Sequence, residues 1–188
     1  MVNLIQNDDK KPVYVDRRRL CQINTPRPTL TWTPLPHARL MDAVEGQLEN
    51  RGFRIHQSNC LLTHSGDRFF GTVTVSDRSN LGYRRAVGIR NSHDKSLAAG
   101  LVAGAKVVVC SNGWFFGDEI ALSRKHTSRL FDDLDQRIEA GFSRIFDEWE
   151  KNDKRVIHYR EHELEDKEAH DLVIRSVDAE ALAPSAIP

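Results

Sequence analysis

The feature that most constrains the fold is an alternation of residue character between positions 53 and 90. In "RFFGTVTVS" one face of the chain runs through Phe69, Gly71 and Val73, and a period of two returns in "YRRAVGIR". Alternation with a period of two is typical of strands with one buried face. Together with "FRIHQSNCLLT", these segments make three strands joined by short connections. Such strands pair in antiparallel order, because a parallel pair needs a long crossover. We therefore predict an antiparallel meander.

A helix is predicted directly before the meander. Its apolar residues recur at the helical spacings of three and four: Leu40, Ala43, Val44 and Leu48. Pro36 precedes this pattern, and "RG" at residues 51–52 supplies a stop. Residues 1–36 hold five of the seven prolines, which fix φ and disfavour a helical residue before them. We therefore predict an extended N-terminal arm over residues 1–36.

A second helix is predicted after the meander, over residues 92–104. Ser92 has the side chain of an N-cap, and Asp94 is favourable in a first turn. An apolar stripe follows: Leu97, Ala98, Leu101 and Val102. Beyond this helix, "AKVVVC" and "WFFGDEIALSRKHT" are predicted as two further strands.

Two helices are predicted in the last third of the chain. Residues 128–149 carry an amphipathic stripe, which is typical of a core or dimer face: Leu130, Leu134, Ile138, Phe142, Ile145 and Trp149. A polar helix is predicted over residues 160–175, and the remaining residues have a disordered composition. The fold class is thus predicted as α+β, with an antiparallel or mixed sheet of about five strands and helices on one face. Residues 37–150 form the predicted core domain, and residues 151–188 an acidic helix and tail.

The formal net charge of zero conceals a division along the chain. Residues 1–126 carry 18 Lys and Arg against 11 Asp and Glu, whereas residues 127–188 carry 9 against 16. A basic body with an acidic tail is typical of proteins that handle polyanions, and the tail can compete for the same surface. The alternative is that the tail is a solvated acidic helix.

Location and redox setting follow from what the sequence lacks. No apolar run approaches the roughly 20 residues that span a bilayer, and the first residues do not have the order of a secretory signal. We therefore expect a cytoplasmic protein with no membrane partner. The three cysteines are widely spaced and form no C-x-x-C pair, which argues against a disulfide framework and a zinc knuckle.

The strongest candidate site is the stretch "RNSHDKS", because it packs charged and polar groups beside a strongly apolar segment. It comprises Arg90, Asn91, Ser92, His93, Asp94, Lys95 and Ser96. At a predicted strand-to-helix junction, free backbone N–H groups favour an anion, and the two cations add to that preference. A phosphate or a nucleic-acid backbone would suit such a site. The alternative is a helix cap with solvated neighbours.

A second basic cluster, Arg124, Lys125 and His126, ends the last predicted strand. It would join the first cluster if the two strand ends lie side by side; otherwise it is a charged sheet edge. A third group places Arg84 and Arg85 among aromatic residues: Phe69, Phe70 and Tyr83. Such a surface binds single strands through stacking and phosphate contacts, although aromatic residues are favoured in strands in any case.

The eight histidines show neither H-E-x-x-H nor H-x-H spacing, so no metal site and no cofactor are predicted. His158 and His162 lie four residues apart, but in a solvated acidic helix. If the chain is an enzyme, His93 or His126 would act as general acid or base, with Asp94 orienting it.

At "GIRNSHDKSLAAGLVAGAKVVVC", followed by "NGWFFGD" and "RKHT", the sequence resembles a family of phage- and plasmid-borne proteins of unknown function. The resemblance covers roughly residues 37–150 and implies a mobile-element setting, in which replication, recombination and counter-defence are common tasks. The helix–strand–strand–strand–helix order is also similar to that of single-strand annealing proteins, as a fold-level analogy only.

These observations predict a nucleic-acid-binding protein of a phage or plasmid, acting in recombination, annealing or replication. Single-stranded DNA is the favoured partner, and a homo-oligomer is expected. Two alternatives stay open: an enzyme acting on a phosphate-bearing substrate, and an antagonist of host defence that acts by binding protein.

Overall fold

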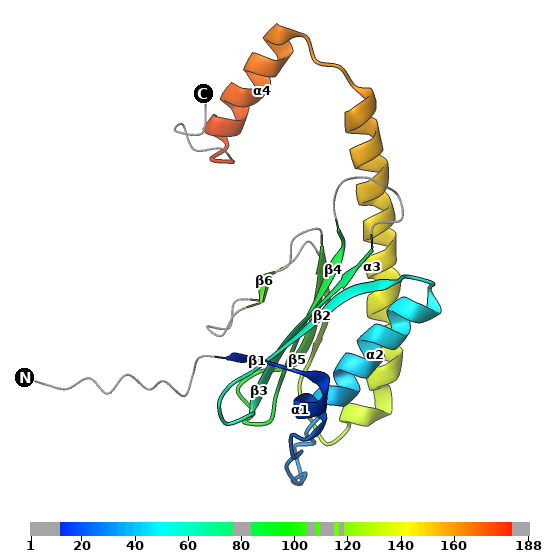
Figure 1. Cartoon of the computed structure of the whole chain (residues 1–188), viewed down its shortest axis with the longest axis vertical. Coiled ribbons are helices and arrows are strands. Elements are labelled where there is room, and N and C mark those ends of the chain that lie inside the picture. Colours follow the sequence, from blue (N-terminus) through cyan, green and yellow to red (C-terminus); the bar gives the residue numbers. More distant parts are fainter. Residues whose placement is uncertain (1–11, 77–83, 105–107, 110–114, 117–118, 182–188) are drawn as a thin grey trace, which may run out of the picture. The chain divides into compact units, whose positions relative to one another are not determined.

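The computed structural model describes residues 12–76, 84–104, 108–109, 115–116 and 119–181 (Figure 1). The chain divides into two compact units, residues 1–151 and 152–188, and each is described by itself. The first unit is built on a six-stranded antiparallel sheet with helices, which confirms the predicted α+β class.

The sheet has one continuous order of neighbours. Its strands are β1 (Val13–Val15), β2 (Ile55–Leu62), β3 (Arg68–Val75), β4 (Ala86–Ser92), β5 (Ala99–Gly104) and β8 (Glu119–Arg124). The predicted meander is confirmed, since β2, β3 and β4 are sequential antiparallel neighbours. In its register, Gly71 of β3 lies between Cys60 and Ile89. Two short strands, β6 (Val108–Val109) and β7 (Phe115–Phe116), pair with each other instead.

The segment that was predicted as an extended arm contributes to the folded unit. Its residues 13–15 add β1 to the edge of β2, and residues 17–21 form the short helix α1 (Arg17–Cys21). Asp16 caps α1, because its carboxylate accepts a hydrogen bond from the Arg19 amide at 2.7 Å. Residues 22–36 then run without helix or strand to the next element, and Leu20 and Leu35 are buried in the core.

The helix predicted over residues 92–104 is wrong. Residues up to Ser92 belong to β4, residues 93–98 form a turn (the 93–98 turn), and residues from Ala99 onward form β5. All six residues of β5 are buried, and the strand pairs with β4 on one side and β8 on the other. An apolar run that is buried on both faces loses its alternation, so its pattern is equally compatible with a strand and a helix.

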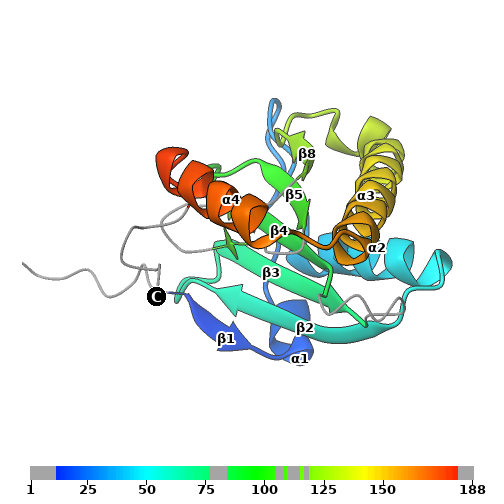
Figure 2. The ribbon, with the colours of Figure 1, turned by 90° about the horizontal axis from the view of Figure 1, so that it is seen from above.

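Two helices cover one face of the sheet (Figure 2). They are α2 (His37–Asn50) and α3 (Leu130–Glu161), whose apolar stripes belong to the same core cluster as Phe69, Val73 and Leu101. The predicted helix over residues 37–50 is confirmed, and the predicted 128–149 stripe is core. Helix α3 is longer than predicted and runs from the first unit into the second.

The second unit comprises the end of α3 and the helix α4 (Asp166–Asp178). A reciprocal capping box of Glu165 and Glu168 sets the start of α4, which lies six residues later than predicted. Residues 182–188, most of the tail predicted to be disordered, lie outside the described residues. Among the helices that the structure describes, none is long and apolar enough to cross a membrane.

Candidate functional site

The two basic clusters lie at neighbouring strand ends. Strand pairing sets Ala99 opposite Arg124, so the 93–98 turn and residues 125–127 adjoin the same end of the sheet. A pocket of about 360 Å³ lies there and is called the lysine pocket. Its lining residues are Trp32, Lys95, Ser96, Leu97, Ala98, Lys125, His126 and Thr127. The two strand ends therefore lie side by side, and residues of both basic clusters line the same pocket.

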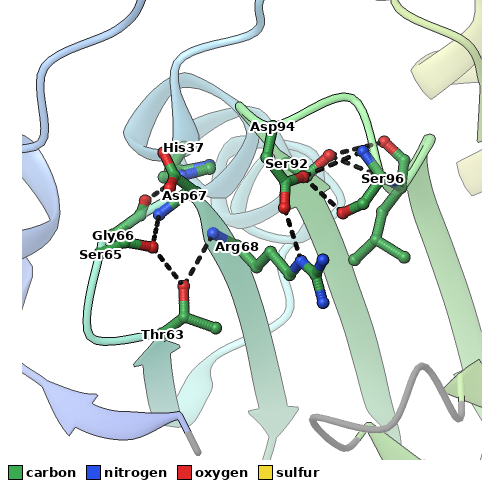
Figure 3. A network of polar contacts seen from close by, with 10 residues as sticks. His37, Thr63, Ser65, Gly66, Asp67, Arg68, Ser92, Asp94 and Ser96 are labelled. Atoms are coloured by element: carbon green, nitrogen blue, oxygen red, sulfur yellow. Dashed lines mark hydrogen bonds and ion pairs between the residues drawn. The ribbon is translucent and has the colours of Figure 1, made fainter. Parts of the chain in front are cut away.

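Local hydrogen bonds hold the 93–98 turn in place. The buried Ser92 hydroxyl accepts from the Leu97 amide at 2.9 Å and lies 3.0 Å from the Leu97 carbonyl oxygen, to which it donates. Asp94 accepts from the Ser96 amide at 2.9 Å and from Arg68 Nε at 2.7 Å (Figure 3). Although desolvation alone would raise the pKa of Asp94, these hydrogen bonds from Ser96 and Arg68 lower it. The Ser92 side chain thus bridges the two ends of the 93–98 turn and does not cap a helix.

Lys95 sits at the tip of this turn in an unusual backbone conformation. Its φ is 65°, in the left-handed region that glycine, asparagine and aspartate tolerate best. Its ammonium lies 5.0 Å from the centroid of the Trp32 ring, within the range of a cation–π contact. The turn therefore places a cation at the pocket at some cost in backbone energy.

Beneath the turn lies a buried pair of imidazoles. The rings of His37 and His93 stack with centroids 3.8 Å apart and an interplanar angle of 8°. Asn91 Nδ2 donates to His37 Nδ1 at 2.9 Å, and His37 Nε2 donates to the Gly66 carbonyl at 3.0 Å. Because Nδ1 accepts and Nε2 donates, these partners fix the neutral tautomer of His37.

Burial agrees with this protonation state. Desolvation, and then the proximity of His93, lower the pKa of His37 to about 3. Desolvation also lowers the pKa of His93. Both rings are therefore neutral at pH 7, as a stacked buried pair requires.

The Leu35 carbonyl ties the 22–36 segment to this end of the sheet. It accepts from Asn91 Nδ2 at 2.7 Å and from His93 Nε2 at 2.9 Å. Three residues earlier the same segment carries Trp32, whose carbonyl accepts from the Thr29 amide at 2.8 Å. Asn91 and His93 thus position the segment that supplies one wall of the lysine pocket.

His126 contributes a second wall. It is 7% exposed, and its ring centroid lies 6.3 Å from that of Trp32. Desolvation, then His93 and Arg124, lower its pKa to about 4, so it is neutral at pH 7. Both ring nitrogens of His126 and Nε1 of Trp32 are buried without a hydrogen-bond partner. An unmade buried hydrogen bond costs about 1–3 kcal/mol, so these three covered nitrogen atoms are unfavourable in their present positions.

The other predicted site residues lie elsewhere or are engaged. Arg124 binds the Asp133 carboxylate at 3.0 Å. Arg90 lies in β4, an inner strand of the sheet, and desolvation lowers the pKa of its guanidinium. Arg84 and Arg85 precede β4 at its far end, roughly 20 Å from Asn91 at about 3.3 Å per residue. Arg85 lies over the rings of Phe53 and Trp149.

Two of the three aromatic residues of the predicted stacking surface are buried. Phe69 and Phe70 are 0% and 1% exposed, so neither ring can stack on a base, and Tyr83 lies outside the described residues. Four residues that line the pocket were not predicted as site residues: Trp32, Leu97, Ala98 and Thr127. Of these, Trp32 is the one with a signal in the sequence. Its signal was a lone tryptophan within the proline-rich stretch "TLTWTPLP".

The geometry also bears on metal binding and on the enzyme alternative. Within the described ranges, no group of three His, Cys, Asp or Glu side chains could hold a metal ion. The Asp94 carboxylate is bonded to Ser96 and Arg68, while His93 Nε2 is bonded to the Leu35 carbonyl. The hydrogen bonds of Asp94 thus go to Ser96 and Arg68, and the His93 ring is oriented by the Leu35 carbonyl and not by Asp94.

Comparison with family models gives a match over residues 29–185, to a family described as a domain of unknown function (DUF932). The resemblance to an uncharacterised family is thereby confirmed, and the match extends beyond the predicted limits of 37–150 to include Trp32. No curated protein and no solved structure matches the chain.

Proposed function

Because the chain belongs to the DUF932 family, a family of domains of unknown function, we propose a role from its own geometry: it binds single-stranded nucleic acid by its phosphates. The observation that carries the proposal is the lysine pocket. Lys95 and Lys125 come from two different segments and line one pocket, and none of its described lining residues carries a carboxylate. Two cations in a concave site attract an anion more strongly than the same charges on an open surface.

The backbone of Lys95 supports a functional reading of the turn. A left-handed conformation costs a residue other than glycine roughly 1–2 kcal/mol. Asparagine or glycine would fit this position with less strain, yet the position carries the long cationic side chain that reaches Trp32. Strain of this kind is often kept at binding sites because the surrounding structure stabilises it.

The binding mode that the pocket supports is phosphate contact and not base stacking. Trp32 is 8% exposed and has the Lys95 ammonium over its ring. Of the three aromatic residues from which the stacking surface was predicted, the two that the structure describes are buried. Affinity should therefore depend on charge and on salt more than on base composition.

The biological setting is part of the proposal. The resemblance to phage- and plasmid-borne proteins favours recombination, annealing or replication of mobile-element DNA. The predicted homo-oligomer gains no support from the α3 stripe, since its residues up to Trp149 lie in the core of the first unit.

An enzyme acting on a phosphate-bearing substrate is the second candidate, and one observation favours it. His126 is neutral, lines the lysine pocket and has two unpartnered ring nitrogens, as a proton acceptor or donor would need. Phosphate release from a phosphorylated oligonucleotide by the wild type, lost in His126→Gln, would favour this role.

The proposal predicts salt-dependent binding that requires both lysines. Lys95→Asn keeps a side chain that tolerates the left-handed backbone, and Lys125→Gln removes an exposed charge. Each change should weaken binding of labelled single-stranded DNA. Each should also reduce the slope of log K against log salt by about 0.7, the value for one phosphate contact on a single strand. Fluorescence anisotropy at several salt concentrations measures both quantities.

Lys151→Gln is the matched control, because this exposed lysine lies on α3 beside Glu148 and outside the lysine pocket. It should leave affinity and slope unchanged. If the wild type binds no DNA or RNA at low salt, the proposal is wrong. If the pocket variants match the control, the binding surface lies elsewhere.

A further inference from the structure

We infer that the lysine pocket takes the terminal phosphate monoester of a strand in preference to a phosphodiester within it. This inference rests on the proposed nucleic-acid binding and makes it specific. It follows from three properties of the pocket, namely its size, its charge and its unpartnered polar groups.

The size of the pocket suits a strand end. Its volume of about 360 Å³ is near the lower limit of small-molecule sites, which span about 300–1,000 Å³. Three segments line it: Trp32, residues 95–98 and residues 125–127. An internal phosphate carries a sugar on each side and must lie in a groove that is open in two directions. A terminal phosphate carries one nucleoside and can enter end-on.

The charge of the pocket also fits a monoester better. A phosphate monoester carries about −1.5 to −2 charges at pH 7, whereas each phosphodiester carries one. Lys95 and Lys125 match the higher value. The nearest carboxylate in sequence, that of Asp94, is bonded to Arg68 and Ser96, which satisfies its own charge.

The third property is the set of unpartnered nitrogens in the wall. Trp32 Nε1 carries a hydrogen, and the neutral His126 ring carries one more, so these two side chains of the wall hold two N–H donors without a partner. A monoester presents three acceptor oxygens to them and to the lysines. Because these nitrogens are buried, the inference requires the two side chains to rotate on binding, a common change at binding sites.

Three oligonucleotides of one sequence test the inference, with a 5′-phosphate, a 3′-phosphate or hydroxyl groups at both ends. The full chain should bind one phosphorylated form about tenfold more tightly than the hydroxyl form at low salt, because two extra charge contacts are made. Millimolar inorganic phosphate should abolish this preference. The comparison of the two phosphorylated forms shows which end is taken.

Two variants assign the preference to the pocket. Trp32→Phe keeps an aromatic ring and removes the N–H, and Lys125→Gln removes an exposed charge. Either should reduce the preference to less than about threefold while affecting the hydroxyl form less. Lys151→Gln should keep the full preference. Since Lys125 is exposed, its variant remains informative even if Trp32→Phe destabilises the fold.

The outcomes separate the two proposals. Equal affinity for all three oligonucleotides would overturn the terminal-phosphate inference and leave nucleic-acid binding in place. An unchanged preference in both variants would place the terminal phosphate at another site and would overturn it too. Absence of any binding would overturn the proposed function itself.

Discussion

Acidification from pH 7 to pH 5 is expected to destabilise the protein by several kcal/mol, because its buried histidines stay neutral when folded. The pKa of His37 is about 3 and that of His126 about 4, against about 6.5 in an unfolded chain. As the pH falls below 6.5, the unfolded state therefore binds protons that the folded state does not. Each such histidine lowers the free energy of unfolding by about 1.4 kcal/mol per pH unit, or about 2 kcal/mol by pH 5.

The sign follows from the direction of the shift. Stability is complete above pH 6.5 and is lost as the pH falls towards the folded pKa values of about 4 and 3. His93, whose pKa desolvation also lowers, adds to the loss. Since pH 5 lies above the usual carboxyl pKa of about 4, the histidines dominate this window.

Urea unfolding at pH 7 and pH 5 measures the effect. His37→Gln should be less stable than the wild type at pH 7, since contacts to Asn91 and Gly66 change, but its loss between the two pH values should be smaller by about 2 kcal/mol. His56→Gln changes an exposed histidine of β2 and should lose as much as the wild type. An equal loss in all three proteins would contradict the account.

Two glycine-to-alanine changes are expected to have opposite effects. In α3, a Cβ at Gly141 would lie 2.8 Å from the Ala121 carbonyl oxygen of β8. Backbone on both sides has to move, so Gly141→Ala should destabilise by about 2–3 kcal/mol despite the higher helix propensity of alanine. In α2, a Cβ at Gly46 meets nothing within 4 Å. Gly46→Ala should therefore stabilise by about 1 kcal/mol.

Chemical denaturation of the two variants checks this contrast, and each serves as the control for the other. Both replace a helical glycine with the same residue, so the difference in sign isolates the close approach of α3 to β8. Stabilisation by Gly141→Ala would contradict a close approach of α3 to β8 at this position.

The meander and the helix over residues 37–50 could be predicted because their signals are local. Val73 and its alternating neighbours face a core on one side, and Leu40, Val44 and Leu48 repeat with the helical period. In α2 and in the second half of β3 buried positions alternate with less buried ones, so the period of burial appears directly in the sequence. The basic residues at the strand ends could also be predicted, because residue type and the approximate ends of strands are local properties of the sequence.

Two features of the strands around the 93–98 turn were decided only in three dimensions. Residues 99–104 became a strand because neighbours on both sides pair with it and bury both faces, which removes the periodicity that would distinguish strand from helix. Asn91, Ser92 and His93 became buried positioning groups, because their partners Leu35 and Leu97 accept hydrogen bonds inside the fold.

The lysine pocket itself depends on contacts that no local pattern contains. Strand pairing brings Lys125 to the 93–98 turn, and the Leu35 carbonyl brings Trp32 to both from more than 50 positions away in sequence. The sequence by itself determined which residues carry charge and where strands and helices repeat. Only the tertiary structure decided which of those charges share a pocket, because hydrogen bonds and strand pairs between distant segments set that geometry.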